Sequence, residues 1–324
     1  MKTIAEYQEL IVNQIDLLEQ NKSDLALYDP VSYILSIGGK RLRPVLTLIA
    51  TDLFNGNLDD SYKSALGIEM FHNFTLLHDD IMDDAPLRRG MDTVHEKWDI
   101  NAAILSGDVM FVQAFVMVTS CKTEYLRSVL DLFNITAIEV CEGQHLDMEF
   151  ETREDVTIPE YIEMIKLKTS VLVGCALKLG AILSDASKEA ADLIYDFGLN
   201  LGIAFQIQDD ILDVFGDAAL FGKQVGGDIL ANKKTYLLLK ALENANEVQG
   251  EELNSWLTKS DYQAEQKVEA VTTIFTDLKV KEQAESVMWS YYDKAIESLN
   301  SIGLSEEKES YLLNFAKGLM IRTK

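Results

Sequence analysis

The sequence predicts an all-α protein, and three observations support this. Apolar residues recur at intervals of three and four positions almost throughout the chain, as at Ile4, Tyr7, Ile11 and Ile15. Strand-like alternation bounded by turn residues is scarce. Only four prolines occur, and the last of them is Pro159. Long helices can therefore run without interruption through the second half of the chain.

Helix breaks are predicted where glycine, proline, asparagine and aspartate gather. They fall at Asp29-Pro30, at Gly38-Gly39, at residues 55–57, 155–159 and 184–187, and from Phe215 to Gly227. These breaks delimit about ten or more helices of ordinary length. Because no repeat of fixed period and no low-complexity linker interrupts them, we expect a single domain, residues 1–324, built as a helical bundle.

The chain is strongly acidic, with a formal charge of −24 at pH 7. Such a charge repels nucleic acid and anionic lipid, so we expect neither as a partner. An anionic substrate would need metal ions or a local cluster of basic residues.

The composition indicates a soluble, cytoplasmic protein. The N-terminus carries early acidic residues and an amphipathic pattern, unlike a signal peptide. The longest uncharged stretch, from Val109 to Cys121, is shorter than the ~20 residues of a membrane-spanning helix. We expect it to be a buried core helix. The three cysteines have no close spacing, which argues against a disulfide framework.

A group of aspartates, Asp79, Asp80, Asp83 and Asp84, lies in the segment LLHDDIMDDAPLRRG. The apolar stretch before it has a helical pattern, so Asp79 and Asp83 are one turn apart on one face. Like charges at this spacing repel each other and destabilise a helix. Mg²⁺ would offset that cost, since it prefers hard oxygen ligands. An acidic first turn on a solvated helix explains this cluster equally well when it is taken alone.

The same spacing recurs at Asp209, Asp210 and Asp213 in FQIQDDILDVFGD. Both clusters interrupt strongly apolar helices, where unpaired carboxylates are costly to bury. Two acidic helices that face each other would hold several cations around one diphosphate. The glycine and glutamate of an EF-hand loop are absent at their required offsets, so calcium storage is disfavoured.

Basic residues gather near glycines and near the first aspartate cluster: Lys40, Arg41 and Arg43 in SIGGKRLRP, Arg88 and Arg89 in LRRG, Lys223 in FGKQVGGD, and Lys233 and Lys234 in ANKKT. Glycines allow the backbone to approach an anion closely. Each group alone is typical of a basic surface patch. In a chain this acidic, their shared placement favours a role in binding an anion.

The ordered set of motifs resembles the trans-isoprenyl diphosphate synthases, the polyprenyl synthetase family. The motifs that carry the resemblance are GGKRLRP, HDDIMDDAPLRRG, GQHLD, KLKTS, FQIQDDILD and the run GK…GGD…NKKT. They follow in order from Gly38 to Thr235. The resemblance implies an all-α bundle of the isoprenoid synthase type around a deep central cavity, usually homodimeric, with the two aspartate clusters facing across its mouth.

The resemblance also implies residue roles. Metal ligands would be Asp79, Asp80, Asp83, Asp209, Asp210 and Asp213, with about three Mg²⁺ ions per site. The allylic diphosphate would be bound by Arg88, Lys168, Lys223 and Lys233, and isopentenyl diphosphate by Lys40, Arg43, His72 and Arg89. Thr169 and Gln206 would lie beside the developing positive charge, while Gln144 and Asp147 would line the site. Ser170 and Gly227 depart from the family pattern, which often has glycine and lysine there.

The implied reaction condenses isopentenyl diphosphate with an allylic diphosphate (dimethylallyl, geranyl or farnesyl) to a short all-trans prenyl diphosphate. Phe74 precedes Asp79 by about 7.5 Å of helix. Phe74 would close the bottom of the cavity, with the small Thr75 beside it and Phe71 one turn deeper. This pattern favours the twenty-carbon geranylgeranyl product, with farnesyl next. Ordinary core packing is the alternative for both phenylalanines.

Four other functions compete with this prediction. A longer-chain polyprenyl synthase is the nearest, and it usually has a small residue where this chain has Phe74. A class I terpene cyclase usually lacks the cations for isopentenyl diphosphate. A non-catalytic regulatory subunit would be expected to have lost one aspartate cluster. A purely structural helical protein would leave the paired motifs unexplained.

Overall fold

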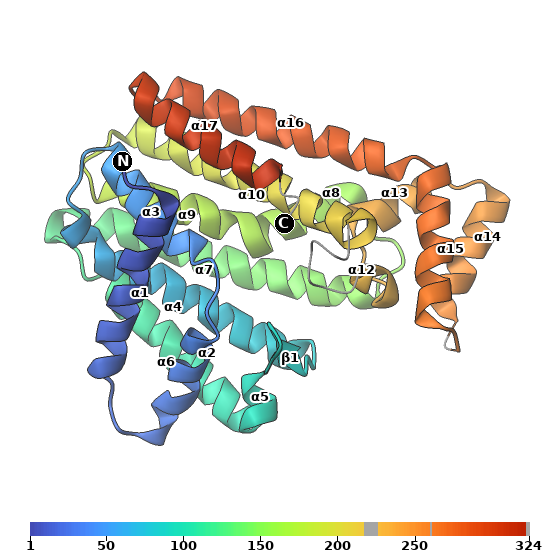
Figure 1. The fold of residues 1–324 in the computed structure, drawn as a ribbon, viewed down its shortest axis with the longest axis horizontal. Coiled ribbons are helices and arrows are strands. Elements are labelled where there is room, and N and C mark those ends of the chain that lie inside the picture. The colour runs from blue at the N-terminus through green and yellow to red at the C-terminus, as the bar shows by residue number, and fades with distance from the viewer. Residues whose placement is uncertain (217–225, 260, 322–324) are drawn as a thin grey trace. The chain divides into compact units, whose positions relative to one another are not determined.

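The computed structural model describes residues 1–216, 226–259 and 261–321. Helices account for most of this range, and the one sheet within it is a two-stranded hairpin (Figure 1). The all-α prediction is therefore confirmed. Contacts divide the chain into two compact units, Met1–Ala137 with Leu172–Tyr195, and Ile138–Val171 with Asp196–Lys324. The single domain predicted for residues 1–324 stays a prediction.

The first unit contains the N-terminal helices and the hairpin. Its elements are α1 (Ile4–Gln20), η1 (Ala26–Tyr28), α2 (Asp29–Ser36), α3 (Leu42–Leu53), α4 (Leu58–Met82), β1 (Leu87–Arg88), β2 (Met91–Asp92), α5 (Val94–Lys97), α6 (Ile100–Val118), the first half of α7 (Thr123–Thr152), α9 (Val171–Ile182) apart from its first residue, and the start of α10 (Lys188–Phe215). The predicted breaks at Asp29-Pro30, at Gly38-Gly39 and at residues 55–57 and 184–187 lie at helix ends. The interruptions at residues 83–99 and 119–122 were not predicted.

The packing of α4 against α6 forms the centre of this unit (Figure 1). Gly67 of α4 makes the close approach possible, because a Cβ there would lie 2.8 Å from the backbone nitrogen of Val118. The hairpin follows α4 directly and pairs Leu87 with Asp92 and Arg88 with Met91. Its two turn residues, Arg89 and Gly90, both have positive φ, as tight two-residue hairpins require.

The prediction of a buried core helix between Val109 and Cys121 was wrong. α6 carries a row of exposed apolar side chains, and Val112 among them is 60% exposed. By length and composition α6 is apolar enough to cross a membrane, and 28% of its most apolar 18-residue window is buried within the structure. Periodicity marks an apolar face, but it does not reveal whether the chain itself covers that face.

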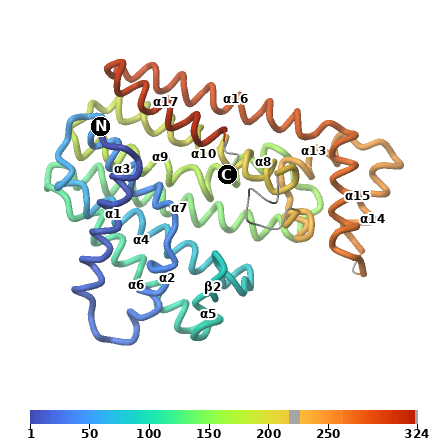
Figure 2. Tube along the Cα trace, viewed as in Figure 1, coloured from blue at the N-terminus to red at the C-terminus, as the bar shows by residue number. Residues whose placement is uncertain are grey.

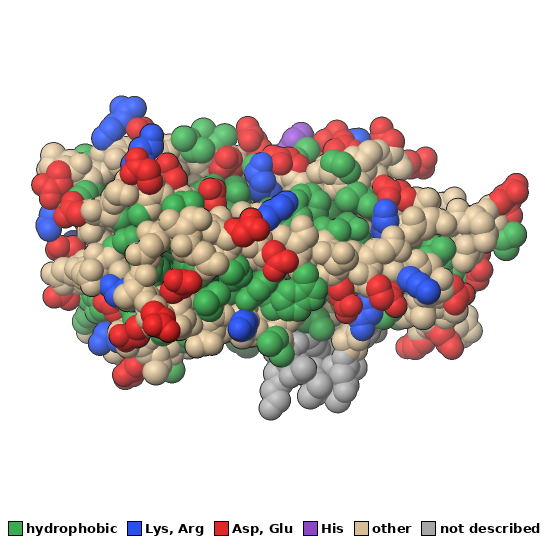
Figure 3. All heavy atoms as spheres, turned by 90° about the horizontal axis from the view of Figure 1, so that it is seen from above, with side chains coloured by type: hydrophobic (Ala, Val, Ile, Leu, Met, Phe, Trp, Pro, Cys, Tyr) green, Lys and Arg blue, Asp and Glu red, His purple; other side chains and the backbone are tan. Residues whose placement is uncertain are grey.

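The second unit contains the rest of α7 and α10 and the C-terminal helices. Its other elements are α8 (Ile158–Ile165), the single-turn π-helix η2 (Lys166–Ser170), α12 (Gly227–Leu230), α13 (Tyr236–Asn244), α14 (Glu247–Thr258), α15 (Ala264–Asp277), α16 (Val280–Ser301) and α17 (Glu306–Met320). Helix α15 packs against α12, α13, α14 and α16, and it lies beside α14 (Figure 2). Acidic side chains are scattered over the face seen in Figure 3, in keeping with the formal charge of −24.

Candidate functional site

The first aspartate cluster lies at the C-terminal end of α4. Asp79 and Asp80 belong to the last turn, and the exposed Asp83 is the C-cap, whose N–H donates to the Asp79 carbonyl at 2.9 Å. The first-turn alternative is therefore excluded. The C-terminal end of a helix carries partial negative charge, so carboxylates there are unfavourable without cations. Each like-charged pair one turn apart adds about 0.2–0.5 kcal/mol to that cost.

Arg88 of the hairpin supplies one such cation. Its Nε lies 2.9 and 2.8 Å from the two carboxylate oxygens of Asp80, and its Nη2 lies 2.6 Å from Oδ1. The same Nη2 is 3.7 Å from Asp79. Because Asp80 is also buried, its two oxygens are directed at Arg88 rather than at solvent. This bidentate pair holds the hairpin against the end of α4.

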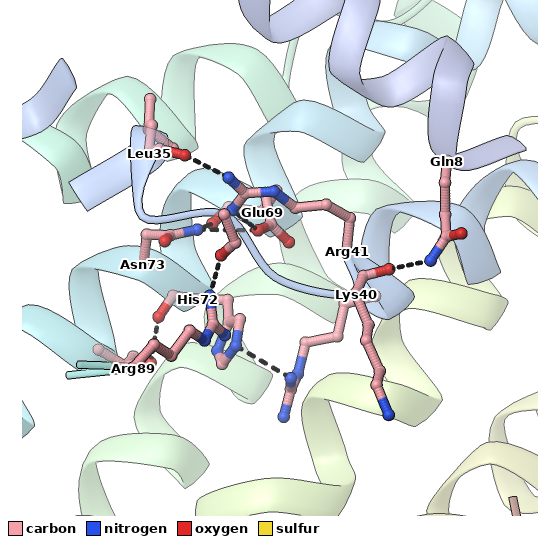
Figure 4. A network of polar contacts seen from close by, with 11 residues as sticks. Gln8, Leu35, Lys40, Arg41, Glu69, His72, Asn73 and Arg89 are labelled. Atoms are coloured by element: carbon pink, nitrogen blue, oxygen red, sulfur yellow. Dashed lines mark hydrogen bonds and ion pairs between the residues drawn. The ribbon is translucent and has the colours of Figure 1, made fainter. Parts of the chain in front are cut away.

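Four arginines surround His72, a half-buried residue of α4. The pKa of His72 lies well below its usual range because of burial and because Arg43, Arg89, Arg88 and Arg41 all repel a second positive charge. The ring is therefore neutral, and its Nε2 lies 3.1 Å from Arg43 Nη1 (Figure 4). In a chain of charge −24, this cluster is a local region of positive potential.

The loop between α2 and α3 completes the cluster. Gly38 and Gly39 have positive φ values of 79° and 136°, which glycine adopts without strain. The Arg89 guanidinium donates to the Gly38 carbonyl, and a Cβ on Gly39 would collide with that guanidinium. Gln8 of α1 donates to the Lys40 carbonyl at 2.6 Å, and the Lys40 side chain is exposed. The two glycines thus allow Arg89 to lie directly against this loop.

The predicted floor residues belong to an aromatic cluster. Phe71 is fully buried, and its ring centroid lies 5.6 Å from Phe74, 6.0 Å from Phe111 and 5.3 Å from Phe133. Phe74 is half-buried and lies 5.3 Å from Phe111. Thr75 turns its hydroxyl back to the His72 carbonyl at 2.8 Å. Phe111 of α6 and Phe133 of α7 were not predicted, because their helices come close to α4 only in the fold.

The second aspartate cluster, in the other unit, also ends a long helix. Asp209, Asp210 and Asp213 lie in the last two turns of α10. Tyr161 donates a hydrogen bond to Asp210, and Gln206 Nε2 lies 3.5 Å from its other oxygen. Burial and the nearby carboxylate of Asp228 raise the pKa of Asp210 to about 8. Tyr161 and Gln206 therefore fix the buried Asp210 side chain, whereas Asp209 and Asp213 are half-buried.

The KLKTS segment forms the π-helix η2, a feature that is common at functional sites. Lys168 Nζ lies 2.5 Å from Asp147 of α7, and Thr169 Oγ1 lies 3.5 Å from Gln206 Oε1. Half-buried Gln144 lies one turn before Asp147 on α7. These four predicted residues and Gln206 belong to one unit.

The departure at Ser170 has a structural counterpart. Ser170 is fully buried, and a Cβ on Gly202 of α10 would lie 2.9 Å from the Ser170 Cα. The glycine that allows this close approach is therefore Gly202 of α10, whereas position 170 carries a serine.

The turn after α12 carries Lys233, which is exposed. The residues that hold this turn in place were not predicted from the sequence. Lys267 of α15 is 0% exposed and donates to Asn232 Oδ1 at 2.6 Å, and Asn232 has a left-handed φ of 53°. The Asp228 N–H donates to Asp213 Oδ2 at 2.9 Å, which connects α12 to the aspartate cluster. A lysine in the helical pattern of α15 reads as a surface residue, so no sequence signal pointed to it.

The predicted residues thus fall into two groups. Lys40, Arg43, His72, Asp79, Asp80, Asp83, Arg88 and Arg89 belong to the first unit, and Gln144, Asp147, Lys168, Thr169, Gln206, Asp209, Asp210, Asp213 and Lys233 belong to the second. Lys223 lies outside the described residues. Within the described ranges, no three His, Cys, Asp or Glu side chains form a ready-made metal site. Mg²⁺ takes one or two carboxylates and completes its shell with water and phosphate, and the aspartates of each cluster offer oxygen donors of that kind.

Comparison with known proteins identifies the family. Residues 24–275 match the polyprenyl synthetase family. The chain belongs to that family. It is 39% identical over 319 residues to the geranylgeranyl diphosphate synthase of Saccharolobus solfataricus, covering 95% of each chain. It is 38% identical over 298 residues to that of Methanosarcina mazei, covering 91% of this chain and 90% of the other.

Solved structures agree with this assignment. A crystal structure of a geranylgeranyl pyrophosphate synthase matches with a TM-score of 0.94 at 44% identity, covering 100% of both chains. The predicted class, a prenyltransferase that acts as an isoprenyl diphosphate synthase, is confirmed. Enzymes of this family depend on magnesium and use isoprenyl diphosphates as substrates.

The state of His72 is open to direct measurement. We expect its ring to stay neutral at a pH where an unperturbed histidine is half protonated, because the arginines oppose protonation. Bound inorganic pyrophosphate should raise the pKa of His72, since the anion offsets the arginine charges. Ring ¹⁵N NMR would follow both changes, with His72→Gln to assign the signal and the urea-unfolded chain as the reference. Equal titration in the folded and unfolded chains would contradict the cluster.

Proposed function

We propose that this enzyme condenses isopentenyl diphosphate with an allylic diphosphate, in the presence of Mg²⁺, to give geranylgeranyl diphosphate. The arginine cluster around His72 is the observation that carries the proposal. Arg88 and Arg41 are paired with Asp80 and Glu69, whereas Arg43 and Arg89 lie close to the neutral imidazole and repel each other. A diphosphate is a suitable complement for these two cations. The relatives named geranylgeranyl diphosphate synthase support the same substrate class.

Isopentenyl diphosphate would bind to Lys40, Arg43, His72 and Arg89. A neutral His72 fixes the Arg43 guanidinium through their 3.1 Å contact without adding a charge of its own. The guanidinium is thereby oriented before the substrate arrives, which lowers the entropy lost on binding. Lys40 is exposed, so its ammonium group would contact the diphosphate from the solvent side.

The allylic diphosphate would bind to Arg88, Lys168, Lys223 and Lys233. Arg88 is paired with Asp80 and Lys168 with Asp147. Both cations are therefore already held in place at half-buried positions. A diphosphate oxygen would share them with the carboxylates, so neither cation would have to be desolvated anew.

Asp79 and Asp83 on α4 and Asp209 and Asp213 on α10 would hold the magnesium ions, about three in all. Asp80 would act chiefly by fixing Arg88, and Asp210 by its contact with Tyr161. The negative ends of two helices favour bound cations. When bound, Mg²⁺ supplies positive charge that stabilises the departing diphosphate.

The remaining chemistry needs oriented dipoles. The C–O bond of the allylic substrate breaks, and the double bond of isopentenyl diphosphate attacks the resulting cation. One proton then leaves and is accepted by the released diphosphate. Thr169 and Gln206, whose oxygens lie 3.5 Å apart, would direct partial negative charge at the cation. Their contact keeps both side chains oriented through the reaction.

Removing either aspartate cluster tests the metal roles. Asp79→Asn and Asp209→Asn should each lower kcat by about 100-fold to 1,000-fold, the usual loss for one preorganised electrostatic group. Asp84→Asn is the matched control, because Asp84 adjoins the cluster but lies outside the repeated spacing, and asparagine tolerates its φ of 48°. Steady-state assays with radiolabelled isopentenyl diphosphate, alongside circular dichroism, would measure this. Full magnesium-dependent activity in both test variants would refute the assignment.

The aromatic cluster is the proposed determinant of product length. Phe74 contacts Phe71 and Phe111, and a growing chain that reached it would meet three rings. Relatives at 38% and 33% identity are named geranylfarnesyl diphosphate synthase, so product length differs among similar chains. We favour the twenty-carbon product because Phe74 is bulky and the residue next to it, Thr75, is small.

Phe74→Ala should lengthen the product beyond twenty carbons, because it removes the ring nearest the growing chain. Phe315→Ala on α17, a half-buried phenylalanine of the other unit, is the control and should leave the product unchanged. Chromatography of the dephosphorylated products would compare the two. An unchanged product length in Phe74→Ala would show that Phe74 does not limit chain growth. A cyclic hydrocarbon product would indicate a terpene cyclase.

The exposed apolar face of α6 supports a homodimer as the working form. Ile104, Leu105, Val112 and Val116 lie on it at spacings of one, four, seven and eight positions, along one side of the helix. A monomeric protein rarely leaves such a face open to water. Asp108 in the middle of the helix disfavours a membrane as its partner. A second copy of the same face would bury it symmetrically.

Val112→Asp should convert the dimer to a monomer, since it places two charges in the paired face. Val248→Asp on α14 is the matched control, because Val248 is equally apolar and 73% exposed. Light scattering after size-exclusion chromatography would give the mass of each variant. A wild-type monomer, or an intact dimer in Val112→Asp, would exclude α6 as the interface.

A further inference from the structure

A buried ion pair lies behind the arginine cluster. Arg41 is 8% exposed and Glu69 of α4 is 3% exposed, and Arg41 Nη1 donates to Glu69 Oε1 at 2.6 Å. Asn73 Nδ2 donates to the same Oε1 at 2.9 Å, and Arg41 Nη2 donates to the Leu35 carbonyl (Figure 4). Burying two charges is costly unless hydrogen bonds satisfy them, and Glu69 Oε2 is buried without a hydrogen-bond partner among the described residues. The contacts to Glu69 Oε1 and to the Leu35 carbonyl hold the Arg41 guanidinium at both of its terminal nitrogens.

The pair fixes a strained backbone. Arg41 has a left-handed φ of 49° at the N-cap of α3, a conformation that L-residues other than glycine, asparagine and aspartate seldom adopt. Its side chain is held at both ends of the guanidinium, so the backbone cannot relax without breaking buried contacts. Lys40 precedes Arg41 directly and Arg43 follows two residues later. The direction of both cations therefore depends on Arg41.

The other partner lies close to the rest of the cluster. Glu69 is three residues before His72 on α4, on the same side of the helix. Its negative charge raises the pKa values of both Arg43 and Arg89, against the lowering caused by burial. Glu69 is thus a carboxylate within reach of three arginines, and it offsets part of their mutual repulsion. Asn73, one turn later, orients its carboxylate.

Arg41 does not qualify as a substrate ligand itself. Its guanidinium is buried and two of its nitrogens are already occupied. The carboxylate of Glu69 would repel a diphosphate. Both residues act through Lys40, Arg43 and His72.

We propose that Arg41 and Glu69 are positioning residues that set the affinity of this site for isopentenyl diphosphate, separately from the allylic diphosphate. The inference rests on the proposed function of the cluster. It predicts a change in one substrate's KM, because the pair supports the loop and helix turn that carry the isopentenyl diphosphate ligands. The groups assigned to the allylic substrate in the second unit have other supports.

The test separates positioning from folding. Arg41→Met or Glu69→Leu alone leaves a buried charge without its partner and should lower the melting temperature. The double variant Arg41→Met/Glu69→Leu removes both charges and should recover most of the melting temperature. Its KM for isopentenyl diphosphate should nevertheless stay raised by about tenfold or more, as small misplacements of binding groups cost that much. Its KM for farnesyl diphosphate should change by less than about twofold.

Two comparisons make the result decisive. Lys178→Met/Asp192→Leu removes another ion pair of the same unit, 2.5 Å long and partly exposed, and should leave both KM values unchanged. Arg41→Lys keeps the charge but loses the planar fork, so it should raise the same KM in a folded protein. A wild-type KM for isopentenyl diphosphate in the double variant or in Arg41→Lys would overturn the proposal. A wild-type enzyme that does not consume isopentenyl diphosphate would instead overturn the proposed function.

Discussion

Negative charge at the C-terminal ends of two long helices is the constraint on which the site depends. α4 and α10 each end in a set of aspartates with the same spacing, where the helix dipole already carries negative charge. A sequence selected only for stability would place lysine or arginine there. The aspartates at these ends are therefore a cost to folding, and cations must offset it. Arg88 does so for Asp80 within the chain.

The arginine cluster concentrates positive charge, which a neutral histidine and a buried carboxylate partly compensate. Like charges around His72 repel one another, and the imidazole responds by staying neutral. Glu69, buried at 3% exposure, supplies the compensating charge from behind. Asp80 and Arg41 are thus each held by a partner of opposite sign, Arg88 and Glu69 respectively. A diphosphate substrate and its metal ions would neutralise the charges that these partners leave uncompensated.

Local backbone features give the cluster its precision. Gly38 and Gly39 permit a loop that Arg89 touches directly, and Arg41 holds a left-handed conformation through its side chain. In the other unit, the π-helix directs Lys168 at Asp147. Each of these features is unfavourable or uncommon in isolation. They persist because contacts with neighbouring residues hold them in place.

The sequence by itself determined the helical class, the helix breaks, the family and the identity of the charged motifs, because periodicity, turn residues and motif order are local properties. It did not reveal that the aspartates end their helices, that α6 leaves its apolar face exposed, or that Arg41, Glu69 and Lys267 are buried. Burial and pairing join residues such as Arg41 and Glu69 that are distant in the chain, and Lys267 looks like any surface lysine until α15 packs against α12. Only the tertiary structure decided these, since the cost of burying a charge depends on which partners the fold brings to it.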